Sequence, residues 1–254
     1  MNTQDGPDGP GGQDAPGTLD TALAAAWLAA AARAVEEHEQ ELTALDSAIG
    51  DGDHGSNLRR GFTAVRLLLP DPTADPGPPG TRPDGSEPDS TGQDGTDQDS
   101  PRDLLRTAGT TLISTVGGAS GPLYGSALRA MGAALPDGPA DAAQLAAALA
   151  AGLAAVQGLG GAVLGDKTMV DALAPAVEAF RAAADRGLPQ AAEAAARAAE
   201  QGAAATEPLQ ARKGRASYLG PRSTGHRDPG AQSTALLLRA LATAAGAPSA
   251  GPPG

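Results

Sequence analysis

The sequence contains no cysteine and very few aromatic residues: one Trp, two Tyr and two Phe among 254 residues. The lack of cysteine excludes disulfides, zinc sites built on thiolates and a cysteine nucleophile. The scarcity of aromatic and β-branched side chains leaves little material for a sheet. Any core is therefore expected to come from helices rich in alanine, the strongest helix former.

The chain also lacks an excess of positive charge. It has 18 Lys and Arg against 30 Asp and Glu, which gives a formal net charge of −12 at pH 7. Because no basic face is available to neutralise a track of phosphates, nucleic acid is not expected as a partner. The N-terminal residues are acidic and polar, and the alanine-rich runs are broken by charge or glycine. We therefore expect no secretory signal, no membrane span and a cytoplasmic location.

Three segments lack the apolar side chains that a core needs. Residues 1–18 contain no Leu, Ile, Val or aromatic residue, and residues 246–254 consist of Gly, Pro, Ala and Ser. Residues 70–101 carry eight acidic residues and one Arg, with one Ala as their single aliphatic side chain. Such segments cannot bury enough apolar area to offset their ordering entropy, so all three are predicted to be disordered. One domain is predicted over 19–245, with 70–101 as an acidic insert.

The remaining sequence reads as about eight helical runs, with apolar residues at helical spacing. They are expected at 19–45, 54–69, 102–116, 121–135, 139–157, 167–184, 188–205 and 230–245. Short connections indicate antiparallel neighbours, and hence an all-α bundle or closed barrel. The loops after the first, third, fifth and seventh runs are rich in Gly, small polar and charged residues. Alternate loops of such a bundle share one end, so we predict a ligand site at that rim.

The first of these loops holds three carboxylates, Asp46, Asp51 and Asp53, within eight residues, followed by His54 and Asn57. Carboxylates this close repel one another unless a cation lies among them, and hard cations such as Mg²⁺ take oxygen ligands. The alternative is that Asp51 or Asp53 simply caps the following helix. Since one Asp would suffice for a cap, the pattern favours a Mg²⁺ and phosphate site.

Two further loops are less specific. Residues 117–125 read GGASGPLYG. They form either a tight helix corner or a turn whose N–H groups and Ser120 hydroxyl meet a phosphate. Residues 165–171 read GDKTMVD, where a P-loop is rejected because an Asp intervenes before the Lys and no strand precedes it. Asp166 or Thr168 is expected to cap the next helix there, alongside contact between Met169 and an adenine ring.

The fourth loop is basic, with four cations between residues 212 and 222. It is either a solvated surface loop or a group of charges that offsets those of ADP. Arg215 is the best placed to pair with a phosphate in a bidentate manner. His226 follows in the same loop and is assigned no chemistry.

Taken together, these stretches resemble the nucleotide-binding L subunit of the dihydroxyacetone kinases. The resemblance runs from about residue 19 to 245 outside the insert, and is carried by four motifs in order. They are LDSAIGDGDHGSN, GGASGPLYG, GDKTMVDAL and GRASYLGPRSTGHRDPGA. It implies a barrel of antiparallel helices with ADP or ATP and two Mg²⁺ at one end. The acidic insert and the loop before GDKTM depart from the family pattern.

The resemblance also implies roles for individual residues. The metal ligands are Asp46, Asp51 and Asp53, and Arg215 stabilises phosphate charge during catalysis. The implied nucleotide contacts are His54, Gly55, Ser56, Asn57, Ala119, Ser120, Gly160, Met169, Arg215, Asp228, Pro229 and Gly230.

The chain carries no substrate domain, so the resemblance implies a separate subunit that needs a K subunit holding dihydroxyacetone. The phosphoryl donor is then either a phosphotransferase-system protein or free ATP, and a homodimer is also compatible with the sequence. Two other functions stay open: the nucleotide domain of a fatty-acid-type kinase, and an ADP-holding module that acts on a transcription regulator.

Overall fold

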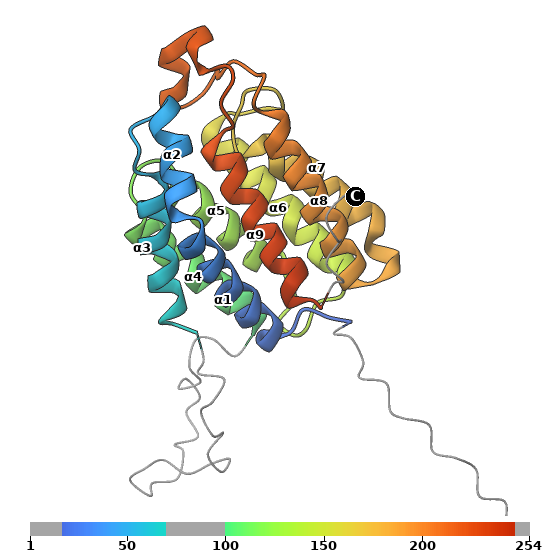
Figure 1. Ribbon diagram of the computed structural model, residues 1–254. Coiled ribbons are helices and arrows are strands. Elements are labelled where there is room, and N and C mark those ends of the chain that lie inside the picture. The colour runs from blue at the N-terminus through green and yellow to red at the C-terminus, as the bar shows by residue number, and fades with distance from the viewer. Residues whose placement is uncertain (1–16, 70–99, 247–254) are drawn as a thin grey trace, which may run out of the picture.

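The computed structural model describes residues 17–69 and 100–246 (Figure 1). Segments 1–16, 70–99 and 247–254, on which most of the predicted disorder falls, lie outside the described residues. Within the described ranges the chain is helical, and its one β feature is an isolated bridge between Leu19 and Ala140. The prediction of an all-α fold is confirmed.

The elements follow one another along the chain with short connections. They are α1 (Thr21–Glu37), α2 (Glu39–Ile49), α3 (His54–Arg66), α4 (Pro101–Thr115), α5 (Ser120–Ala134), α6 (Ala142–Gly160), α7 (Val170–Ala183), the 3₁₀ segment η1 (Ala184–Arg186), α8 (Leu188–Ala205), the 3₁₀ segment η2 (Arg215–Ser223) and α9 (Pro229–Ala244).

The helices pack in chain order around a shared core (Figure 1). Each helix from α3 onward contacts the next, up to α8 against α9, and both α9 and α3 contact α1. The contacts therefore run in a ring, whereas the regular geometry of a barrel stays a prediction. By length and composition, α6 is the one described helix apolar enough to cross a membrane, and it packs between α5 and α7.

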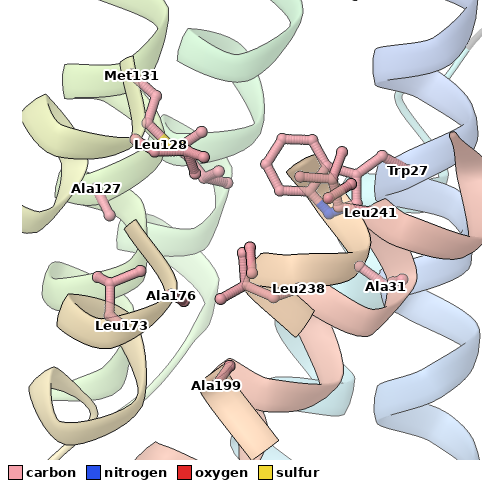
Figure 2. Packing of buried hydrophobic residues seen from close by; sticks show 14 of the residues in the cluster. Trp27, Ala31, Ala127, Leu128, Met131, Leu173, Ala176, Ala199, Leu238 and Leu241 are labelled. Atoms are coloured by element: carbon pink, nitrogen blue, oxygen red, sulfur yellow. The ribbon is translucent and has the colours of Figure 1, made fainter. Parts of the chain in front are cut away.

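The core combines a few large side chains with many alanines (Figure 2). Trp27 of α1 is 4% exposed, and its indole N–H donates to the carbonyl oxygen of Leu237 in α9 at 2.9 Å. Leu128, Met131 and Leu238 fill the space between the helices. Burying side chains of this size stabilises the fold by about 1.5–3 kcal/mol each.

Small residues let some helices approach backbone to backbone. A Cβ added to Gly109 of α4 would lie 2.6 Å from the carbonyl oxygen of Gly125 in α5, and one at Gly125 would lie 2.5 Å from that of Gly109. No side chain fits at such distances, so this pair of glycines sets the separation of the two helices.

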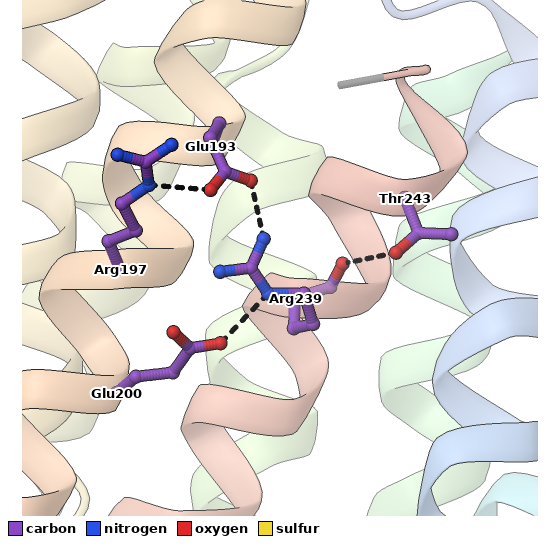
Figure 3. Close-up of polar contacts among 5 residues, drawn as sticks. All are labelled: Glu193, Arg197, Glu200, Arg239 and Thr243. Atoms are coloured by element: carbon purple, nitrogen blue, oxygen red, sulfur yellow. Dashed lines mark hydrogen bonds and ion pairs between the residues drawn. The ribbon is translucent and has the colours of Figure 1, made fainter. Parts of the chain in front are cut away.

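A polar network joins α8 to α9 (Figure 3). The Glu193 carboxylate is buried and accepts from Arg197 at 2.6 Å and from Arg239, which also donates to Glu200 at 2.8 Å. Burial raises the pKa of Glu193, but the two arginine hydrogen bonds outweigh it and hold the pKa below its usual value. The buried charge is thus fully paired, as a stable fold requires.

Most helix boundaries differ from the sequence prediction by one to three residues. The run expected at 19–45 is broken at His38, whose ring Nδ1 lies 2.9 Å from the Ala34 carbonyl oxygen. This break divides α1, which packs on α9, from α2, which leads to the carboxylate loop. The helix expected from residue 102 begins at Pro101, and the Ser100 hydroxyl accepts from the Asp103 N–H at its N-terminus.

Candidate functional site

The four loops predicted to share one rim do line a single cavity of about 390 Å³. They are the α2–α3, α4–α5, α6–α7 and α8–α9 connections, which meet at one end of the bundle. The cavity is lined by these predicted site residues: Asp46, Asp51, Asp53, His54, Ala119, Ser120, Gly160, Met169, Arg215, Asp228, Pro229 and Gly230.

The three carboxylates converge at the α2–α3 connection. One oxygen from each of Asp46, Asp51 and Asp53 lies within 4.8 Å of the others. Asp46 is half-buried, whereas Asp51 and Asp53 are exposed. Such a cluster offers hard oxygen ligands to a divalent cation.

The helix cap at this point comes from an unexpected residue. Asp53 occupies the N-cap position of α3, but its side chain makes no capping hydrogen bond. Instead, one Asp46 oxygen accepts from the backbone N–H groups of Asp53 at 2.9 Å and His54 at 3.1 Å. The alternative in which Asp51 or Asp53 serves as a helix cap is therefore not what the structure shows, and both keep their carboxylates for another partner.

The Asp46 carboxylate leaves no room for a side chain at Gly50. A Cβ there would lie 2.1 Å from Asp46 Oδ1. A residue with a Cβ at this position would therefore have to displace the Asp46 carboxylate from the cluster.

His54 belongs to a buried hydrogen-bond chain at the floor of the cavity. Its Nδ1 lies 3.1 Å from the Ser120 hydroxyl and its Nε2 lies 2.9 Å from that of Ser233. Ser233 is in turn 2.7 Å from the Tyr124 hydroxyl, which donates to the Gly230 carbonyl at 3.0 Å. This chain ties together the N-terminal turns of α3, α5 and α9. Burial lowers the pKa of His54, and the charges of Asp46 and Asp53 only partly oppose it.

Arg215 brings η2 to the carboxylates. Its Nη1 lies 2.9 Å from Asp51 Oδ2, and its side chain is 68% exposed. An exposed ion pair of this kind contributes little to stability, about 0–1 kcal/mol. The guanidinium is thus close to the cluster and weakly held.

Asp228 lines the cavity from the start of α9 and is buried. Its carboxylate caps α9 by accepting from the Ala231 N–H at 2.7 Å, and its own N–H donates to the Thr206 hydroxyl at 2.9 Å. Burial raises the pKa of Asp228 to about 7, although the hydrogen bond from Ala231 acts to lower it.

Comparisons with known proteins identify the family of the chain. The DAK2 domain family matches residues 90–243. The chain is 39% identical over 225 residues to the Escherichia coli PEP-dependent dihydroxyacetone kinase, ADP-binding subunit DhaL, covering 86% of this chain and 94% of that protein. It is 38% identical over 224 residues to the DhaL subunit of PEP-dependent dihydroxyacetone kinase 1 from Listeria innocua, covering 88% and 96%.

The chain belongs to the DhaL family. The Escherichia coli and Listeria innocua relatives are, by name, subunits of kinases. The fold is also similar to a crystal structure of the dihydroxyacetone kinase from C. freundii in complex with AMP-PNP and Mg²⁺. That similarity has a TM-score of 0.61 at 28% identity, and covers 96% of this chain and 37% of the other.

Three of the predicted nucleotide contacts of this DhaL family member do not line the cavity. A Cβ at Gly55 would lie 2.2 Å from the Glu39 carbonyl oxygen, so Gly55 packs against α2. Ser56 donates to the Asp53 carbonyl at 3.0 Å, and buried Asn57 accepts from Arg60 at 2.8 Å. In the structure these residues shape the first turn of α3, and their contact with a nucleotide stays a prediction.

Other lining residues of this DhaL family member were not predicted. Lys167 and Thr168 lie within a motif that the sequence singled out, and Lys213 lies in the basic loop. Of the two capping candidates for α7, Thr168 accepts from the Val170 N–H at 3.2 Å, whereas Asp166 accepts from the Val163 N–H. In the sequence, Lys167 stands between two polar residues. Periodicity alone does not distinguish a cavity-lining lysine in such a stretch from one in a solvated loop.

Proposed function

We propose that this chain is the ADP- and ATP-binding subunit of a dihydroxyacetone kinase, which transfers a phosphoryl group to dihydroxyacetone held on a partner K subunit. The observation that carries the proposal is the convergence of Asp46, Asp51 and Asp53 with Arg215 at the mouth of a cavity. Carboxylates supply ligands for the cation of a nucleotide, and an arginine supplies charge for its phosphates. The named functions of the DhaL relatives support the same interpretation.

The carboxylate cluster fits Mg²⁺ by its chemistry. It offers only hard oxygen donors, two of its members are exposed, and the third is oriented by two backbone N–H groups. We propose that Asp46, Asp51 and Asp53 hold two Mg²⁺ ions, which would neutralise charge on the phosphates.

The protein groups around the cluster have distinct roles in this proposal. Arg215 would leave Asp51 and pair with a phosphate, where it stabilises charge that develops during transfer. The backbone N–H groups at the start of α5, next to Ala119 and Ser120, would face the phosphates. Met169 and Gly160 would contact the base, and Asp228 to Gly230 would close the opposite wall. No described residue of the cavity is assigned as the general base, so that group is expected on the partner.

The partner would dock over the cavity mouth, since transfer requires the acceptor in line with the nucleotide phosphate. Four apolar residues within two or three positions of lining residues in the sequence are exposed: Leu159 at 57%, Val163 at 59%, Leu164 at 62% and Tyr218 at 88%. Exposed large apolar residues are candidates for contact with such a partner. The relatives are named PEP-dependent, so we propose a phosphotransferase-system protein as the donor that rephosphorylates bound ADP. A cytoplasmic location follows from that partner, and a homodimer stays a prediction.

The test is formation of dihydroxyacetone phosphate by the purified chain with Mg²⁺ and ATP, with and without a K subunit. The proposal expects steady product only in the mixture, and calorimetry should show ADP binding in Mg²⁺ that weakens at least about tenfold in EDTA. Product formed at the same rate by the chain alone would refute the division of labour. Equal ADP affinity in EDTA would refute the metal site.

A further inference from the structure

Lys167 is the most unusual charged residue in the structure. It lies between α6 and α7 and is 1% exposed, although lysine is almost never fully buried. Among the described residues it is also the one non-glycine residue with positive φ, at 61°. A left-handed backbone is unfavourable for a residue with a Cβ, so the surrounding structure must hold Lys167 in place.

The Lys167 ammonium makes three hydrogen bonds, all to backbone carbonyls. It donates to Thr206 at 3.0 Å and to Leu209 at 3.1 Å, where the chain leaves α8. It also donates to His226, where the chain returns toward α9. An ammonium has three N–H donors, so all are used. One buried charge therefore joins the two stems of the 206–228 loop.

Further bonds pin the same stems at their base. The Gly225 N–H donates to the Glu207 carbonyl at 2.8 Å, and the Ala211 N–H donates to the Ser223 hydroxyl at 2.9 Å. The Arg212 N–H donates to the carbonyl of Asp166, the residue before Lys167, at 3.0 Å. These hydrogen bonds and those of the Lys167 ammonium hold the two stems together at the base of the loop. Together they are here called the clamp.

The tip of this loop is held less firmly than its base. It consists of η2, which begins with Arg215 and contacts α2. The ion pair of Arg215 with Asp51 is exposed, and such pairs contribute little. The position of the Arg215 guanidinium therefore depends mainly on how the stems are fixed.

We infer that Lys167 is a positioning residue for Arg215: its ammonium locks the two stems of the 206–228 loop and so places the guanidinium at the carboxylate cluster. The inference rests on the proposed function for its catalytic consequence, but not for the loop itself. Burial lowers the pKa of Lys167, and the charges of Asp228 and Glu207 oppose this effect, so these two carboxylates favour the charged form at the clamp.

The experiment compares three variants of the full chain with wild type. Lys167→Met keeps an unbranched side chain, one atom shorter than that of lysine, but removes every donor. Ser223→Ala removes the hydrogen bond from the Ala211 N–H, which links the same two stems. It replaces Lys167→Met in the comparison if circular dichroism shows that Lys167→Met is unfolded. Arg222→Gln is the matched control, because it removes an exposed cation from the same loop. Hydrogen exchange of the 206–228 amides is measured on the chain alone, and the rate is measured with the K subunit.

We expect Lys167→Met to speed exchange of the stem amides by about tenfold or more, with Ser223→Ala intermediate and Arg222→Gln like wild type. The rate constant for transfer should fall at least about tenfold in Lys167→Met. Added to Arg215→Ala, the same change should lower the rate by less than about twofold, since the group being positioned is already gone.

Two results would overturn the inference. One is unchanged exchange of the stem amides in both stem variants. The other is a full, additive loss of rate when Lys167→Met is combined with Arg215→Ala, which would indicate a general structural role. Because exchange needs no kinase activity, the exchange result tests the clamp even if the proposed function fails.

Discussion

Replacing Asp53 with Asn tests the charge of the carboxylate cluster most directly. The two side chains have nearly the same size, and the Asp53 contact with Asp46 uses the backbone N–H, which the substitution keeps. The Asp53 side chain makes no capping hydrogen bond to α3. The change therefore removes one negative charge and little else.

The expected effects on the metal-free and metal-bound protein have opposite signs. The cluster oxygens lie within 4.8 Å of one another, a distance at which two charges repel by about 1 kcal/mol in a water-like surrounding. Removing one charge relieves two such repulsions, about 2 kcal/mol in all, so without Mg²⁺ the melting temperature should rise by about 4–8 °C. With Mg²⁺, the lost ligand charge should weaken ADP binding at least about tenfold, or about 1.4 kcal/mol.

The assay is calorimetric titration of ADP with Mg²⁺ and with EDTA, beside thermal unfolding in EDTA. Asp185→Asn, which removes an exposed charge on η1, is the control and should change neither quantity. An ADP affinity in Mg²⁺ equal to that of wild type would refute the reasoning. So would a clear drop in melting temperature in EDTA, because it would mean that Asp53 stabilises the fold rather than strains it.

Three further outcomes follow from the packing and the pKa shifts. Glu193→Ala should lower the free energy of unfolding in urea by about 2 kcal/mol at pH 7, because Arg197 and the Arg239 Nη1 lose their carboxylate partner, although Arg239 keeps its bond to Glu200. Since the pKa of Glu193 is lowered in the folded state, this difference should be complete above the ordinary pKa of about 4.3 and disappear as the pH falls below it. Asp228 has a raised pKa of about 7, so wild-type stability should fall as pH rises from about 4 toward that value. Asp228→Asn, which keeps an oxygen for the α9 cap, should remove this fall in urea titrations at several pH values. Gly50→Ala should weaken Mg²⁺-dependent ADP binding by about tenfold or more by displacing the Asp46 carboxylate, whereas Gly158→Ala, with nothing within 4 Å of the added Cβ, should not.

The helical class and most helix positions could be predicted because they depend on local pattern. Alanine content and apolar spacing indicate helices wherever they occur, and seven of the predicted runs correspond to single helices. The first run corresponds to two helices, α1 and α2. The sequence did not predict the break between them, because the residues on both sides of His38 have helical propensity. The break depends on which neighbours α1 and α2 pack against, and no local signal reports that.

Part of the site could be predicted for the same reason. The carboxylates of Asp46, Asp51 and Asp53 are close in sequence, so their convergence follows from a short loop. The meeting of four loops followed from the alternation of ends in a helical bundle. Both predictions use connectivity alone.

The sequence by itself determined an all-α chain with a cluster of hard oxygen ligands in one loop. Only the tertiary structure decided which oxygen caps α3, that Arg215 meets Asp51, and that Lys167 is buried under the stems of a distant loop. These contacts depend on how whole helices and loops pack, and most of them join residues far apart in the chain. The energy of that packing comes from many small contacts across the core, which no short stretch of sequence contains.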